Sequence, residues 1–293
     1  MTNKLFCFGF GYTAGVLAER LAGQSFTIVG TRRNPATSLV KPAAIPLCMF
    51  DGTQPSAEVI SLLPDTTHVL ISTPPGSDAD PVLQWHAADL ARLSTLKWIG
   101  YLSTIGVYGD TDGGWVDETS PLQPSSERGR RRAEAEAAWR AFAGAHGKHV
   151  EVFRLPGIYG PGRNTLQTIR AGTARRIVKP GQVFNRVHVA DIATTLARAM
   201  TLASTGLSPP YDAYNVVDDE PAPPQDVVTF AADLLGLPPP PEIPFDAADL
   251  SPMARSFYGE NKRVSNARLK SALLIDLAYP TYREGLRALS NEL

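Results

Sequence analysis

A glycine-rich turn near the first residue constrains the fold more than any other feature of this sequence. Residues 5–15 read LFCFGFGYTAG, so Gly9 and Gly11 directly follow an apolar run, and Ala14 lies in the helical stretch after it. In a strand, turn and helix of this kind, the first glycine permits the tight turn, the second lets the backbone approach a pyrophosphate, and a small third residue allows close helix packing. The helix N-terminus then faces the negative charge. We therefore predict a dinucleotide site that includes Gly9, Phe10, Gly11, Tyr12 and Thr13.

The first half of the chain alternates short apolar runs with amphipathic stretches, which is the pattern of βαβ units in a parallel sheet. We predict strands at residues 5–8, 26–29, 45–50, 69–72, 98–102 and 150–155, and helices at 13–22, 58–63, 81–93 and 130–143. Loops rich in glycine and proline follow, with helical stretches at 192–202 and 225–235. This pattern predicts an α/β fold with a doubly wound parallel sheet of the Rossmann type. We expect a dinucleotide-binding domain at 1–155, and a region at 156–293 that completes the sheet and forms a smaller substrate lobe.

Composition and charge exclude several classes of protein. The chain of 293 residues is 43% hydrophobic and 19% charged, which is ordinary for a globular protein and unlike a disordered one. Its formal net charge of -1 gives no electrostatic reason to expect nucleic acid or an anionic membrane as a partner. We find no apolar run long enough for a signal peptide or a membrane span, and we expect a cytoplasmic protein.

The chain has two cysteines, Cys7 and Cys48, on the predicted first and third strands. With the second strand between them, two strand spacings of about 4.8 Å place them about 10 Å apart. A disulfide tolerates a Cα separation of roughly 7 Å at most. We therefore predict two free, buried thiols.

The turn after the second predicted strand bears on the choice of cofactor. An NAD site usually has an acidic residue there, which binds the ribose 2′-hydroxyl. This chain has Thr31, Arg32 and Arg33 instead, and two guanidinium groups suit a 2′-phosphate. NADP is therefore favoured over NAD, although both arginines could also be solvated surface residues. Further expected cofactor contacts are Asp51, which could instead cap a turn, and Thr73 and Pro74 after the fourth strand.

Several later segments, in order, are similar to those of one family. They are residues 101–109 (YLSTIGVYG), 153–163 (FRLPGIYGPGR), 186–191 (RVHVAD), 214–218 and 265–269. Over nearly its whole length the chain resembles the extended short-chain dehydrogenases, the NAD-dependent epimerase/dehydratase family. The resemblance implies an oxidoreductase or epimerase that acts on a small hydroxy or keto compound or a nucleotide sugar. It also implies a possible homodimer through the helix at 130–143.

The resemblance assigns roles to individual residues. Thr104 falls on the family's active-site serine or threonine. Tyr108 is the phenol nearest in sequence to the expected nicotinamide face and a candidate substitute proton donor, with packing as the favoured alternative role. The loop that covers the nicotinamide corresponds to Pro156, Gly157 and Ile158. The substrate side would include Arg163, Arg186 and His188.

The chain departs from the family at the catalytic tyrosine and lysine. Arg128 stands at the tyrosine position and Arg132 at the lysine position. Arginine stays protonated and cannot exchange a proton in turnover, although Arg132 could still bind a cofactor ribose hydroxyl and Arg128 a substrate. The helix could instead present solvated pairs, Arg130 with Glu134 and Arg132 with Glu136. Arginines in a first turn oppose the helix dipole, which favours an anionic ligand there.

Two hypotheses of different class follow from these observations. The first is an NADP-dependent oxidoreductase or epimerase-like enzyme in which Thr104 polarises the substrate. The second is a non-catalytic NADP-binding protein, a redox sensor or a partner-binding module, because the usual tyrosine and lysine are missing. The two cysteines and five histidines show no zinc-type spacing, and the Gly-x-Ser-x-Gly motif is absent, so we expect no metal site and no acyl transfer.

Overall fold

The structure, a computed structural model, describes residues 2–34, 45–206 and 209–291. Its contacts divide the chain into two compact units, described separately below. The first unit comprises Met1–Thr104, Arg130–Arg154 and Ile192–Tyr214; the second comprises Ile105–Gly129, Leu155–Asp191 and Asn215–Leu293. The chain thus passes between the units several times, whereas we expected a single division after residue 155. Segment 105–129 groups with the second unit, and segment 192–214, which comes from the region expected to complete the sheet, groups with the first.

The first unit contains a seven-stranded sheet in the order β11-β7-β5-β4-β1-β2-β3. Its strands are β1 (Asn3–Phe8), β2 (Phe26–Arg32), β3 (Leu47–Met49), β4 (His68–Ile71), β5 (Trp98–Thr104), β7 (Val150–Leu155) and β11 (Tyr211–Asn215). The pairings β1 with β2, β1 with β4, β2 with β3 and β4 with β5 are all parallel. This confirms the predicted α/β fold with a doubly wound Rossmann sheet.

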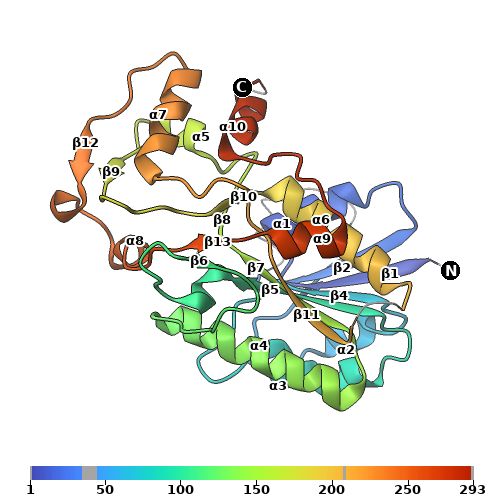
Figure 1. Cartoon of the computed structure of the whole chain (residues 1–293). Helices are drawn as coiled ribbons and strands as arrows, with labels where there is room; N and C mark the ends of the chain where they lie inside the picture. Colours follow the sequence, from blue (N-terminus) through green and yellow to red (C-terminus); the bar gives the residue numbers. More distant parts are fainter. Residues whose placement is uncertain (1, 35–44, 207–208, 292–293) are drawn as a thin grey trace. The chain divides into compact units, whose positions relative to one another are not determined.

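Helices cover both faces of this sheet (Figure 1). The helices α1 (Tyr12–Arg20) and α6 (Val189–Ala203) lie on one face; α2 (Ala57–Leu62), α3 (Pro81–Arg92) and α4 (Glu127–His146) lie on the other. The central strands β4 and β7 are buried at every residue. Because a parallel sheet is covered on both faces, such strands are mainly apolar in sequence, and the charged Glu151 and Arg154 of β7 are buried with polar partners. The main core cluster joins strand residues such as Phe8 and Tyr101 to Trp139 of α4.

The two cysteines lie where the sequence predicted them. Cys7 is on β1 and Cys48 on β3, and β2 lies between these strands. Both are free and buried. Burial raises the pKa of both thiols, that of Cys48 to about 11. Both sulfurs are therefore protonated and unreactive at neutral pH.

A buried ion pair attaches α4 to the sheet. The Arg154 guanidinium is 2.8 Å from the Glu136 carboxylate, and both side chains are almost fully buried. Ser103 donates a hydrogen bond of 2.5 Å to the same carboxylate. This arrangement replaces the solvated pair of Arg132 with Glu136 that the sequence suggested, because Glu136 faces the sheet and not the solvent. Removing one partner of a buried pair leaves an uncompensated charge and is strongly destabilising.

The second unit is built from shorter elements. Its strands form three parallel pairs: β8 (Gly157–Tyr159) with β10 (Arg186–His188), β9 (Arg176–Val178) with β12 (Glu242–Pro244), and β6 (Trp115–Val116) with β13 (Arg263–Val264). Its helices are α5 (Thr165–Arg170), α7 (Pro224–Leu234), α8 (Pro252–Phe257), α9 (Ala267–Leu273) and α10 (Tyr282–Asn291), with 3₁₀ turns η1 (Ile105–Tyr108) and η2 (Phe245–Ala247). The helices α5, α7 and α10 share one hydrophobic cluster, in which Leu166, Ala231 and Leu286 are buried.

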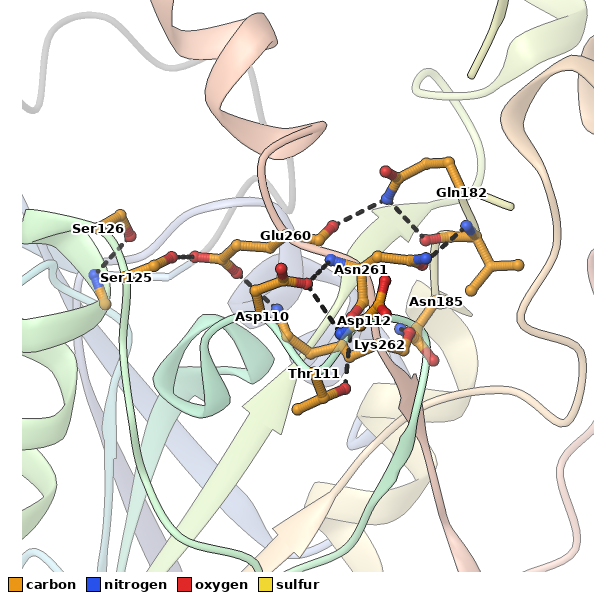
Figure 2. Close-up of polar contacts among 12 residues, drawn as sticks. Asp110, Thr111, Asp112, Ser125, Ser126, Gln182, Asn185, Glu260, Asn261 and Lys262 are labelled. Carbon is orange, nitrogen blue, oxygen red and sulfur yellow. Dashed lines mark hydrogen bonds and ion pairs between the residues drawn. The ribbon is translucent and has the colours of Figure 1, made fainter. Parts of the chain in front are cut away.

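Polar side chains fix the loops of this unit around Asn261 (Figure 2). The Asn261 backbone N–H donates to Asp110 at 2.7 Å, and its side chain accepts from the Val183 N–H at 3.1 Å. Beside it, Lys262 and Ser125 each donate to the Glu260 carboxylate at 2.5 Å. These bonds hold the loop that follows Tyr108 to segments distant in sequence.

Among the residues that the structure describes, none of the helices has the length and hydrophobicity that a membrane span requires.

Candidate functional site

A cavity of about 1000 Å³ opens in the first unit beside the carboxyl ends of β1, β2 and β4. It is lined by Gly9, Phe10, Gly11, Thr31, Arg32, Arg33, Asn34, Phe50, Asp51, Gly52, Thr53, Ser72, Thr73, Pro74, Pro75, Gly76, Ser77, Asp78, Ala79, Pro81, Gln84 and Trp85. Open α/β sheets bind their ligands at this edge. The cavity therefore brings together most of the first-unit residues that the sequence assigned to the cofactor.

The glycine-rich turn has the conformation that its sequence requires. Gly9 has φ +85°, and a Cβ there would lie 3.0 Å from the Thr73 backbone nitrogen. The Gly9 N–H donates to the Thr31 hydroxyl at 2.9 Å, which fixes the turn against β2. Gly11 is the N-cap of α1, with φ −107°. A Cβ on Gly11 would meet no atom within 4 Å, so the space beside this backbone is free for a ligand.

The helix α1 begins directly behind this turn. Tyr12 is its first residue and is half-buried, and Thr13 is buried. The first turn of α1 contains no acidic residue. The dipole of α1 therefore favours an anion beside Gly11.

Basic residues form the wall of the cavity at the end of β2. Arg32 is half-buried and donates from Nε to the Phe10 carbonyl at 3.0 Å, while Arg33 is exposed. Asp51 is exposed, and its carboxylate accepts hydrogen bonds from the N–H and hydroxyl of Thr53 at 2.9 and 2.8 Å. These bonds lower the pKa of Asp51. The carboxylate thus caps a turn, one of the two roles considered from the sequence, and its contact with the cofactor stays a prediction.

Residues on the far wall follow β4. The Thr73 hydroxyl oxygen is buried and has no hydrogen-bond partner among the described residues, so it is available to a ligand. Pro74 lies next to it on the wall. Sequence reasoning missed Gln84 and Trp85 of α3, and the indole of Trp85 donates to the Gly52 carbonyl at 2.9 Å. No motif marks these two residues, since they lie in the second turn of an ordinary amphipathic helix.

The residues at the family's catalytic positions have partners within their own units. In the first unit, Thr104 ends β5 and is half-buried. Arg132 donates from Nη1 to the Tyr101 hydroxyl at 3.0 Å and to the Leu102 carbonyl at 2.7 Å, so it connects α4 to β5. In the second unit, Arg128 is exposed and lies 5.7 Å from the centre of the Phe257 ring.

Tyr108 is a buried residue of the second unit. Its side chain is 1% exposed, and its hydroxyl donates to Oδ1 of Asn215 at 2.7 Å. The phenol proton is therefore held inside the unit. Proton transfer to a substrate would first require this bond to break.

A second, smaller cavity of about 170 Å³ lies in the second unit. It is lined by Gly157, Ile158, Tyr159, Thr165, Arg186, Val227, Tyr282 and Leu286. The parallel register of β8 and β10 places Gly157 opposite Arg186 and Tyr159 opposite His188. The structure thus brings together residues that the sequence assigned to the cofactor loop and to the substrate. Pro156, which is half-buried, precedes β8, and Arg163 is exposed in the following turn.

His188 is held as a neutral ring. Its Nδ1 accepts a hydrogen bond from the Ala190 N–H at 3.2 Å, which assigns the ring proton to Nε2. The ring packs against Tyr159 and Tyr279, with centroid distances of 5.2 and 4.0 Å. Burial lowers the pKa of His188 to about 4. The imidazole is therefore uncharged at neutral pH.

Comparison with solved structures shows one protein of similar sequence and others that share the fold. A functionally unknown conserved protein from Silicibacter pomeroyi is 49% identical, with a TM-score of 0.86 and 99% of each chain covered. The human epimerase family protein SDR39U1, solved with NADPH, is 17% identical, with a TM-score of 0.74 and 99% of this chain and all of that one covered. The UDP-glucose 4-epimerase of Thermus thermophilus, solved with NAD, is 18% identical, with a TM-score of 0.75 and 98% of each chain covered. No curated protein sequence matches the chain.

A sequence model of the NAD dependent epimerase/dehydratase family matches residues 9–216. This range begins at the glycine-rich turn and includes Thr104, Tyr108 and the segment from Arg186 to His188. The match, the Rossmann sheet and the cavity at its carboxyl edge agree with one another. The chain therefore belongs to the NAD-dependent epimerase/dehydratase family.

Proposed function

We propose that this protein binds NADP(H) and uses it in an oxidoreductase or epimerase-like reaction on a small hydroxy or keto compound. The observation that carries the proposal is the cavity of the first unit, in which a glycine-rich turn and two arginines lie on one wall. A bound nicotinamide cofactor supplies the hydride chemistry, and the protein binds and orients it.

Three features of the cavity fit such a cofactor. Its volume of about 1000 Å³ lies within the range of small-molecule and cofactor sites. The space beside Gly11 is open, so a pyrophosphate can approach the backbone at the N-terminus of α1. The buried hydroxyl of Thr73 has no partner among the described residues and can bond to a ligand.

The preference for NADP rests on Arg32 and Arg33. Both line the cavity at the end of β2, and residues 30–34 contain no acidic side chain that would bind a ribose 2′-hydroxyl. Guanidinium groups form charge-assisted, forked hydrogen bonds with phosphate. The relatives support a nicotinamide cofactor without deciding between the two forms, because the human protein was solved with NADPH and the Thermus enzyme with NAD.

Isothermal titration calorimetry with NADPH and NADH tests the cofactor preference. The wild type should bind NADPH more tightly, and Arg32→Ala with Arg33→Ala should weaken NADPH binding by about 2 to 4 kcal/mol, roughly 30- to 1000-fold, with little effect on NADH. A matched control replaces Arg20 and Arg92, which end α1 and α3 and do not line the cavity. Equal affinities of the wild type for NADPH and NADH would remove the basis of the preference.

In the catalytic version of the proposal, Thr104 polarises a carbonyl or hydroxyl of the substrate. Thr104 is the last residue of β5, and the chain continues from it into η1, which ends at Tyr108. Arg128 and Arg132 keep their protons and cannot replace the family's tyrosine and lysine in acid and base catalysis. Proton exchange would then depend on a residue outside that pair.

A non-catalytic NADP-binding protein is the second candidate. Two contacts favour it: Arg132 is bound to β5, and the Tyr108 proton is donated to Asn215. Both groups are thus engaged in holding the fold.

Turnover with a panel of carbonyl compounds and nucleotide sugars separates the two candidates. If the protein is an enzyme, Thr104→Val should slow NADPH oxidation by about 10²- to 10⁴-fold, whereas Thr205→Val, an exposed control in the same unit, should not. If the wild type is inert and the double variant Arg128→Tyr with Arg132→Lys turns over, the protein is a binder that retains the family's site.

A further inference from the structure

We propose that the 170 Å³ cavity of the second unit is a subsite for the carboxylate or phosphate group of a small substrate, with Arg186 as its cation. The identification of the ligand as a substrate rests on the function proposed above. The binding of an anion at Arg186 does not, because it depends on residues of the second unit alone.

Arg186 lines the cavity without an ion-pair partner. Its Nη1 donates to two carbonyl oxygens, of Phe184 at 2.9 Å and of Ala222 at 3.1 Å. Among the described residues, no carboxylate forms a salt bridge with Arg186. Burial lowers the pKa of Arg186, yet a guanidinium remains protonated in proteins. Arg186 is half-buried, so an anionic ligand would stabilise its partly desolvated charge.

Asp218 is the acidic residue with the largest electrostatic effect on Arg186, but the two side chains form no salt bridge among the described residues. The Asp218 side chain is buried, accepts one hydrogen bond of 3.3 Å from the Glu220 N–H, and has no partner for Oδ2 among the described residues. Burial raises the pKa of Asp218 to about 8; Arg186 opposes this rise, while Asp219 and Glu220 add to it. Burial thus favours the protonated form of the Asp218 carboxyl, which weakens its electrostatic pairing with Arg186.

Tyr282 supplies a second donor on the cavity wall. It is 1% exposed, and its hydroxyl is buried with no hydrogen-bond partner among the described residues. Its ring centre lies 6.0 Å from the Arg186 guanidinium carbon. A buried hydroxyl normally has a partner, so this O–H points to a missing acceptor. A guanidinium and a phenol O–H together suit a carboxylate or a phosphate.

The other lining residues and the volume of the cavity limit the size and polarity of the ligand. Ile158, Val227 and Leu286 are apolar and can contact a short carbon chain. The volume of about 170 Å³ lies below the 300 to 1,000 Å³ of typical ligand pockets, so the cavity accepts one charged group and few further atoms. The substrate class is thus an anionic hydroxy or keto compound.

The test measures the melting temperature of the full chain at pH 7 against rising concentrations of sodium acetate, inorganic phosphate and the neutral amide acetamide. It is run with and without saturating NADPH. We expect stabilisation by acetate or phosphate and none by acetamide. Tyr282→Phe should lower the affinity for the stabilising anion about 10-fold or more, because the variant loses a hydrogen bond to a charged group. It deletes a hydroxyl without a protein partner, so its fold should be intact.

Matched variants complete the design. Arg186→Gln should abolish the anion effect, whereas Arg176→Gln and Tyr258→Phe, in the same unit and away from the cavity wall, should retain it. The proposal is overturned if neither anion stabilises the wild type, or if Tyr282→Phe and Arg186→Gln respond as the controls do. It is also overturned if Arg32→Ala with Arg33→Ala removes the anion effect, because the anion then occupies the cofactor cavity. Anion binding that depends on Tyr282 in a protein without affinity for NADPH would refute the cofactor proposal alone.

Discussion

Valine substitutions at Gly11 and Gly9 should separate ligand binding from folding within a single turn. A side chain on Gly11 meets no protein atom within 4 Å, and φ −107° is open to any residue. Gly11→Val should therefore change only the N-cap of α1, at a cost of about 1 kcal/mol in the free energy of unfolding. The same side chain would occupy the space where a pyrophosphate meets the backbone. Losing two charge-assisted hydrogen bonds amounts to about 3 to 6 kcal/mol, roughly 10²- to 10⁴-fold in NADPH affinity.

Gly9→Val should mainly lower the stability of the protein, whereas Gly11→Val should mainly lower its NADPH affinity. At φ +85° a non-glycine residue costs about 1 to 2 kcal/mol, and the approach of 3.0 Å to the Thr73 nitrogen adds about 1 to 3 kcal/mol of overpacking. Circular dichroism melts give the stability of each variant, and calorimetric titration gives its NADPH affinity. A folded Gly11→Val protein with wild-type affinity would refute the reasoning and place the dinucleotide elsewhere.

Three further outcomes follow from buried groups. Tyr108→Phe should cost about 1 to 3 kcal/mol of stability, because it deprives Asn215 of its donor, and should slow any turnover less than 10-fold; a loss of 10²-fold or more would instead identify the phenol as a general acid. Glu136→Gln should lower stability in urea by about 3 to 5 kcal/mol, because Arg154 loses its buried partner; an unchanged midpoint would contradict this. The pKa of Asp218 is raised above its unfolded value of about 4, so its contribution to stability is fully present below pH 4 and is lost as the pH rises toward 8. Asp218→Asn should therefore be more stable than the wild type at pH 8, on the order of a few kcal/mol, with the gap closing at pH 5; denaturation curves at both pH values decide.

The sequence predicted the sheet well where its strands are buried on both faces. The runs that became β4 and β7 are buried at every residue, because helices cover both sides of them. They are mainly apolar, and the charged residues of β7, Glu151 and Arg154, have buried polar partners. The edge strand β11, with the sequence YDAYN, was not predicted as a strand, because Asp212 and Asn215 interrupt its apolar residues. Strands of two or three residues, such as β6, contain too few residues for any periodicity.

Some residues of the candidate site could be predicted from the sequence and others could not. The turn at Gly9 was predictable because its conformation demands a particular residue at each position. Tyr282 and Thr165 were not, because they reach the small cavity through the packing of α5 against α10, which no local pattern encodes. The use of Arg132 as a connection to β5 also depends on the geometry of α4.

Trp85 on the wall of the large cavity gives the protein an intrinsic optical reporter. Its indole is fixed by the hydrogen bond to Gly52, whereas Trp98 and Trp139 are fully buried and Trp115 is mostly exposed. Reduced nicotinamide absorbs at the wavelengths where tryptophan emits, so NADPH in this cavity would quench the emission of Trp85 by energy transfer. A Trp85→Phe variant would give up part of that signal. Occupancy of the cavity can thus be followed by tryptophan fluorescence in the unlabelled protein.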